Sequence, residues 1–185
     1  MQYLGSAFAT GWRHHLWLAA LVGASVAFTL GFACAVPFAA FGAIAAMTLP
    51  RRDALLVTLA LWLVNQIVGF AILHYPTDGL TLLWGAVLGG VAVLSAVAAQ
   101  AMMRRSGIAA AALTSFAAAF LAYEGSLYIV SATALGGTED FTLAIIARIL
   151  AINAAAFAGL LAISLLVTAA RGGLPSRAAA PIASR

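Results

Sequence analysis

The chain has 185 residues, of which 65% are hydrophobic and 8% are charged. A soluble domain carries about 25% charged residues, so this composition excludes an ordinary water-soluble globule and predicts a membrane protein. The net charge of +4 does not indicate binding to nucleic acid, because all nine basic residues are arginines and all but one stand at the edges of apolar blocks.

Charged and turn-forming residues divide the sequence into apolar blocks. The first block, residues 16–49, contains no charged residue. A helix needs about 20 residues to cross the hydrocarbon, and at least about 17, so this block suits two short spans better than one. A break at Pro37 fits, because proline opens a helix without losing a needed N–H. We therefore expect an all-α polytopic membrane bundle of about six transmembrane helices, at residues 16–33, 37–50, 54–73, 80–103, 108–134 and 142–169.

The arginines outside the spans test this count, because positively charged loops stay in the cytoplasm. With six spans they all fall on one side, and both termini lie there too. The opposite side receives the loops at residues 74–79 and 136–140, which are acidic and contain no arginine. The expected organisation is a cytoplasmic N-terminus (1–15), a six-helix transmembrane domain (16–170) and a disordered cytoplasmic tail (171–185).

Residues 13–35 leave other interpretations open. Arg13, an apolar stretch and Ala33-Cys34-Ala35 resemble a signal peptide with its cleavage site, although no polar mature sequence follows. Residues 16–49 could also form one span and a re-entrant segment. The lone Cys34 excludes an internal disulfide framework and a cysteine-built metal site. We expect it to be a small packing residue and a metal ligand only as a remote alternative.

Two ionisable residues lie inside the predicted spans, where lipid makes them costly. At 1.5 Å per residue, Glu124 lies roughly 15 Å and Arg148 roughly 9 Å below the outer face. The two spans are consecutive and antiparallel, so we expect them to be adjacent and the two side chains to form an ion pair. The alternatives are a pair that only locks the fold and an arginine that reaches to the outer headgroups.

Further polar and aromatic residues share this outer half and predict a cavity that opens to the outside. Interhelical hydrogen bonding is the alternative for Asn65 and Gln66, and an interfacial aromatic belt is the alternative for Trp84. The candidate ligand-binding residues are Glu124, Arg148, Asn65, Gln66, Asn153, Tyr123, Tyr128 and Trp84.

Several short stretches resemble a known family. These are the face formed by Ala20 and Ala24, the stretch from Pro37 to Gly42, and the stretch from Asn65 to Gly69. With six short spans, they are similar in layout to the substrate-binding (S) component of energy-coupling factor vitamin transporters. The resemblance implies that the alanine face docks on a transmembrane coupling subunit. The short turn at residues 34–37 departs from the longer first loop of that family, which puts gating by such a loop in doubt.

We therefore expect a multi-pass protein of the bacterial inner membrane that binds and imports a small, vitamin-like or metal-chelate solute. A coupling subunit and an ATPase would supply the energy, because the chain has no phosphate-binding loop. We expect neither an enzyme nor a cofactor, since no nucleophile–base pair is recognisable. The alternative is a structural or assembly subunit of a membrane complex. A channel is the third possibility, and it would need polar residues at all depths.

Overall fold

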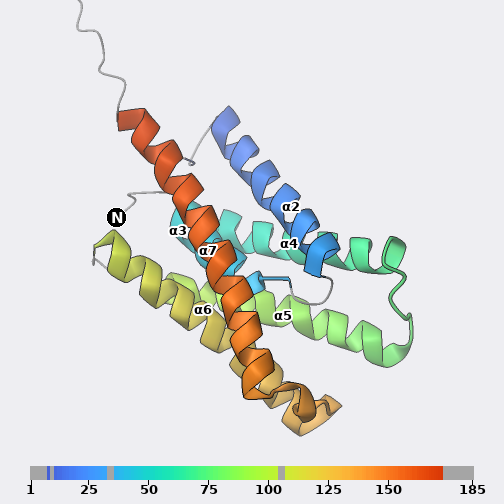
Figure 1. Ribbon diagram of the computed structural model, residues 1–185. Helices are drawn as coiled ribbons and strands as arrows, with labels where there is room; N and C mark the ends of the chain where they lie inside the picture. The colour runs from blue at the N-terminus through green and yellow to red at the C-terminus, as the bar shows by residue number, and fades with distance from the viewer. Residues whose placement is uncertain (1–7, 9–10, 33–35, 104–106, 173–185) are drawn as a thin grey trace, which may run out of the picture.

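The computed structural model describes residue 8 and residues 11–32, 36–103 and 107–172 (Figure 1). These residues form helices and short connections, without any strand. A π-helical turn, η1 (Ser131–Leu135), extends the helix that ends at Val130, and a 3₁₀ turn, η2 (Thr138–Asp140), precedes the last helix. The prediction of an all-α membrane helix bundle is confirmed. The helices are α2 (Trp12–Phe32), α3 (Phe38–Thr48), α4 (Arg51–Ala71), α5 (Gly79–Ala101), α6 (Ile108–Val130) and α7 (Leu143–Gly172).

The short helix α3 forms the core of the bundle. Its sequence is apolar on every side, and such a helix is buried among others or in lipid. All of its residues except Ala46 are buried, and it packs against α4, α5, α6 and α7 (Figure 1). Gly42 permits the close approach to α5, since a Cβ there would lie 3.1 Å from the backbone nitrogen of Ala96. The longer helices are therefore arranged around α3.

The length of α3 revises the predicted second span at residues 37–50. Its 11 residues extend about 16 Å, which is roughly half of the 30 Å hydrocarbon thickness. Pro37 precedes its first residue and Pro50 precedes the first residue of α4. Within the described ranges, five helices are long and apolar enough to cross a membrane. The predicted second span is thus a half-length helix inside the bundle, and it leads to Arg51 and Arg52.

The other predicted spans agree with the structure to within about one turn. α2 begins four residues before the predicted start at residue 16, so that Arg13 and both neighbouring histidines lie in its first turns. Some predictions concern residues outside the described ranges. These are the position of Cys34, the tail from residue 173 onward, most of the first ten residues, and Arg104 and Arg105.

Large side chains of α4 lie over glycines of α5. The Trp62 Nε1 donates to the Gly85 carbonyl at 2.8 Å. A Cβ on Gly85 would lie 2.6 Å from the Gln66 Oε1, and one on Gly89 would lie 2.7 Å from the Trp62 ring. Small residues let helix backbones approach closely in a membrane. Here they make room for an indole ring and an amide of the neighbouring helix.

The first turn of α5 is capped by Asp78. Its carboxylate accepts hydrogen bonds from the backbone N–H groups of Leu80 and Thr81, both at 3.0 Å, and from the Thr81 hydroxyl at 2.8 Å. These bonds satisfy helix N–H groups that have no partner within the helix. The bonds from Thr81, the backbone one foremost, hold the pKa of Asp78 below its ordinary value of 3.8. The cap therefore depends on the ionised carboxylate.

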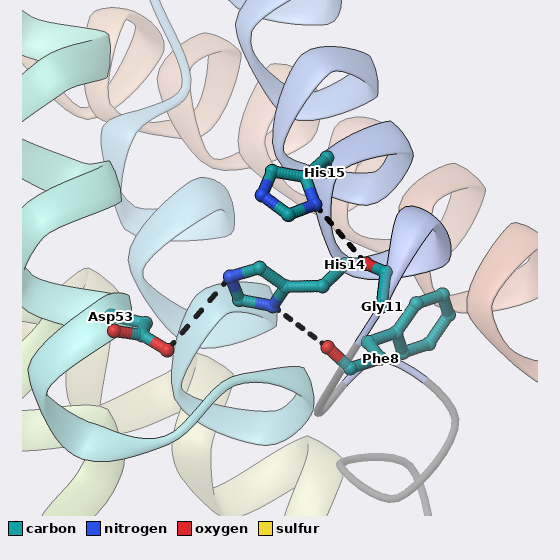
Figure 2. A network of polar contacts seen from close by, with 5 residues as sticks. All are labelled: Phe8, Gly11, His14, His15 and Asp53. Atoms are coloured by element: carbon teal, nitrogen blue, oxygen red, sulfur yellow. Dashed lines mark hydrogen bonds and ion pairs between the residues drawn. The ribbon is translucent and has the colours of Figure 1, made fainter.

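His14 ties the start of α2 to neighbouring parts of the chain (Figure 2). Its Nδ1 lies 2.8 Å from the Phe8 carbonyl oxygen, and its Nε2 lies 3.9 Å from the Asp53 carboxylate of α4. His15, by contrast, contacts the Gly11 carbonyl at 3.1 Å within its own segment. The Phe8 ring stacks on Trp17 at 4.6 Å. These contacts lie at the end of the bundle that carries Arg51.

Candidate functional site

A cavity of about 530 Å³ lies between α5, α6 and α7. It is at the end of the bundle where α5 begins and α6 ends, opposite the end that carries Arg51 and Arg52. Its volume is within the range of about 300–1,000 Å³ that is usual for small-ligand pockets. The lining comprises Val36, Leu80, Trp84, Leu88, Tyr123, Glu124, Leu127, Leu135, Gly136, Gly137, Asp140, Phe141, Ile145 and Ile149.

The helices α5 and α7 each present one stripe of side chains to this cavity. On α5 the stripe is Leu80, Trp84 and Leu88, and on α7 it is Ile145 and Ile149. Residues four apart lie on the same face of a helix. The walls are therefore regular helix faces, and they are mostly apolar.

The half-length of α3 determines where the cavity ends. Val36, just before α3, lines the cavity. One turn below Ile149, the Oδ1 of Asn153 accepts a hydrogen bond from the Ala40 N–H in the first turn of α3, at 3.1 Å. The Nδ2 of the same side chain donates to the Ile149 carbonyl at 3.0 Å. Asn153 is fully buried, so α7 caps a helix N-terminus in the interior of the bundle.

Glu124 brings an acidic group into this apolar cavity. It lies on the buried face of α6 with 8% of its surface exposed, and it lines the cavity beside Tyr123. Its buried Oε1 has no hydrogen-bond partner among the described residues. Burying a polar group without a partner costs free energy, so Glu124 places an unsatisfied acceptor in the wall of the cavity.

A tight loop closes the outer edge of the cavity. The Gly136 N–H donates to the Ser131 carbonyl at 2.9 Å, and the Ser131 hydroxyl donates to the Gly136 carbonyl at 2.6 Å. Gly136 and Gly137 have φ angles of 76° and 90°, which side chains other than glycine rarely adopt. This turn leads the chain into η2 and places Asp140 and Phe141 at the cavity. Asp140 is exposed, so the cavity borders the surface there.

The predicted ion pair between Glu124 and Arg148 is not formed. Among the described residues, the ion pair within 4.0 Å is that of His14 and Asp53. Arg148 is exposed and absent from the cavity lining, although its neighbour Ile149 belongs to it. Successive residues of a helix point about 100° apart, since one turn takes 3.6 residues. Arg148 therefore points away from the face of α7 that lines the cavity.

Asn65 forms a hydrogen bond between helices, and Gln66 forms one to Asn65 within α4. Asn65 is buried, and its Nδ2 donates to the Thr29 hydroxyl of α2 at 3.2 Å. That hydroxyl donates to the Ser25 carbonyl at 2.9 Å, and the Gln66 Nε2 donates to the Asn65 Oδ1 at 3.2 Å. Neither amide lines the cavity. Asn65 thus makes the interhelical hydrogen bond that was the alternative for it, whereas the Gln66 amide bonds within α4.

Of the predicted ligand-binding residues, the structure brings Glu124, Tyr123 and Trp84 together at the cavity. Tyr123 also lies near Phe38, with ring centroids 6.4 Å apart. Tyr128 is 50% exposed and packs edge-on against Phe141 at 5.4 Å, outside the lining. The other members of the predicted set do not line this cavity.

The sequence-based prediction missed most of the apolar residues that line the cavity. It also missed Asp140 and Phe141 of the loop. A signal was present for the apolar stripes, because Leu80, Trp84 and Leu88 follow the four-residue spacing of one helix face. No comparable signal singled out Asp140 and Phe141. Their position depends on how the turn at Gly136 and Gly137 folds back.

Comparisons with known proteins give no family model, no curated protein and no solved structure that matches this chain. Within the described ranges, no group of three or more His, Cys, Asp or Glu side chains could hold a metal ion. The geometry itself is therefore the basis for a functional proposal. It offers a cavity of ligand size with a buried hydrogen-bond acceptor.

Proposed function

We propose that this chain is a membrane subunit that captures a small solute in the cavity between α5, α6 and α7 for import into the cell. The observation that carries the proposal is the Glu124 carboxylate, which faces a ligand-sized cavity without a partner for its Oε1 among the described residues. A mostly apolar pocket with a few polar groups is the usual form of a small-molecule site. Intramembrane carboxylates commonly mark substrate pathways.

The position of the cavity supports capture from outside. It lies at the end opposite Arg51 and Arg52, and the positive-inside rule assigns these arginines to the cytoplasmic side. The protein is then a multi-pass component of the bacterial inner membrane. A coupling subunit and an ATPase would supply the energy for import, as the resemblance to S components of energy-coupling factor transporters implies.

A specific observation favours a second candidate, a structural or assembly subunit without a ligand of its own. The buried amides of Asn65 and Asn153 both bond to other helices. These amides serve the packing of the bundle. The second candidate requires Glu124 to do so too, whereas its Oε1 has no partner within the described residues.

Ligand-dependent thermal shift of the purified full chain tests the proposal, with a panel of vitamins and metal chelates as probes. We expect at least one probe to raise the melting temperature of the wild type and of Arg148→Gln, since Arg148 lies outside the cavity. The same probe is expected to leave Glu124→Gln unchanged. If no probe stabilises the wild type, and Glu124→Gln merely lowers stability, the structural candidate is preferred.

Proteoliposomes test the import step. A stabilising solute, offered outside vesicles that contain the chain with its coupling partners, is expected to accumulate in an ATP-dependent manner. Vesicles containing the Glu124→Gln variant are the control, and they are expected to accumulate much less. Binding without accumulation in the complete assembly would refute import while leaving solute binding in place.

A further inference from the structure

The charges around the cavity have one sign. The described lining holds two carboxylates, Glu124 deep inside and Asp140 at the exposed edge, and contains no arginine, lysine or histidine. Arg148, the nearest cation along α7, is exposed and outside the lining. The low dielectric of an apolar cavity strengthens the attraction between Glu124 and an opposite charge. A positive group would therefore be favoured at this position.

The apolar and aromatic walls of the cavity suit the uncharged part of a molecule that carries this positive group. Trp84 from α5 and Phe141 from the loop line the same cavity as Glu124, and aromatic faces attract cations within about 6 Å. Tyr123 contributes a third aromatic ring beside the carboxylate. Leu80, Leu88 and Ile149 complete apolar walls. A molecule with a charged end and an apolar or aromatic body would satisfy both parts of the lining.

The end of the cavity next to the start of α3 has few free N–H donors for an anion. A helix N-terminus can bind anions through its free N–H groups, and α3 begins just beyond Val36 in the lining. Pro37, however, has no N–H. The Phe38 N–H donates to the Val36 carbonyl at 2.8 Å, and the Ala40 N–H donates to Asn153. Two of the donors that would make this end an anion site, the N–H groups of Phe38 and Ala40, are thus already used.

From these observations we infer that the cavity binds an organic cation, a protonated amine or quaternary ammonium on an apolar or aromatic body. The inference rests on the proposed function and specifies its substrate class. The positive group lies at the Glu124 carboxylate, to which a protonated amine donates a charge-assisted hydrogen bond, whereas a quaternary ammonium is attracted by charge alone. The body lies between Trp84 and Phe141. Asp140 attracts the cation at the entrance.

Three probes that share a phenyl ring on a short alkyl chain and differ in the terminal group test this inference. They are 3-phenylpropylammonium, 3-phenylpropan-1-ol and 3-phenylpropionate. They are positive, neutral and negative at pH 7, and binding to the full chain in neutral detergent is measured by titration calorimetry. We expect the ammonium to bind the wild type about tenfold more tightly than the alcohol, which is about 1.4 kcal/mol. The propionate is expected to bind most weakly.

Two variants test whether Glu124 causes the preference for the ammonium over the alcohol. Glu124→Gln is expected to bind the ammonium and the alcohol equally, with the affinity for the alcohol unchanged. Glu139→Gln is the matched control, because Glu139 is an exposed acid of the same loop that does not line the cavity. It is expected to keep the tenfold preference. Loss of the preference in this control would attribute it to general surface charge and overturn the inference.

The outcomes separate this inference from the proposed function. If the alcohol or the propionate binds the wild type as tightly as the ammonium, the cation class is wrong while solute binding stands. This comparison uses the wild type alone and remains decisive if Glu124→Gln does not fold. If none of the three binds, the solute panel decides: stabilisation by neutral or anionic solutes alone refutes the cation class, and stabilisation by none refutes solute binding itself.

Discussion

Asn153 provides the most direct test of how the bundle is held together. Its side chain accepts the Ala40 N–H at 3.1 Å, and both residues are fully buried. Replacement by leucine keeps the branching of the side chain and removes the acceptor. Because Ala40 lies in the first turn of α3, its N–H has no partner within that helix.

An unsatisfied buried donor costs about 1–3 kcal/mol, and loss of a helix N-cap costs about 0.5–2 kcal/mol. We therefore expect Asn153→Leu to lower the free energy of unfolding by about 2 kcal/mol. For a protein of this size that corresponds to a melting temperature lower by about 4–8 °C. Unfolding in detergent, followed by circular dichroism, measures both quantities.

Ser164→Ala is the matched control on α7. Ser164 is also fully buried, but its hydroxyl donates to the Leu161 carbonyl of its own helix at 2.8 Å. Its removal leaves no donor or acceptor unsatisfied on another helix, and we expect a loss below about 0.5 kcal/mol. The capping argument is refuted if Asn153→Leu unfolds with the wild-type free energy, or if the control loses as much.

Three further predictions follow from the described contacts. A double-mutant cycle of Asn65→Ala and Thr29→Val is expected to give a coupling free energy of about 0.6 kcal/mol, the average for hydrogen bonds between membrane helices; a value of zero in detergent unfolding would contradict the contact. Gly136→Ala is expected to cost about 1–3 kcal/mol because of its positive φ, whereas Gly125→Ala, in an open helical position, is expected to cost nothing in the same assay. Hydrogen bonds from the first turn of α5 lower the pKa of Asp78 in the folded state, so its contribution to stability is present above the unfolded pKa and is lost as the pH falls through the lower, folded value. The melting temperature of the wild type is thus expected to fall in acid more than that of Asp78→Asn, and identical pH profiles would show that the charge of the cap is irrelevant.

Hydropathy along the chain is sufficient to locate the helices. The predicted spans agree with four of the long helices to within a few residues, because charged residues and turns at the membrane edges limit where an apolar helix can end. The length of the block at residues 16–49 also indicated an unusual second segment. Whether it crossed the membrane depended on how much of it was helical, and α3 has 11 residues.

The choice of Glu124 as the central residue also came from the sequence, because a carboxylate in an apolar span is costly wherever it faces. The ion pair with Arg148 that the sequence also predicted is not formed. Asn65 was equally open to ligand contact and to hydrogen bonding between helices, and Asn153 was predicted to contact the ligand, because a linear sequence does not distinguish the two roles. The contacts with Thr29 and Ala40 come from other helices and exist once those helices are packed.

The sequence by itself determined which segments enter the membrane and which residues are costly there. The tertiary structure decided the direction in which each residue points. In helices that are apolar on all sides, no polar face determines the rotation about the helix axis. Arg148 and Ile149 are adjacent in the sequence, yet the first is exposed and the second lines the cavity. Packing against α3 and its neighbours sets that rotation, and with it the composition of the cavity.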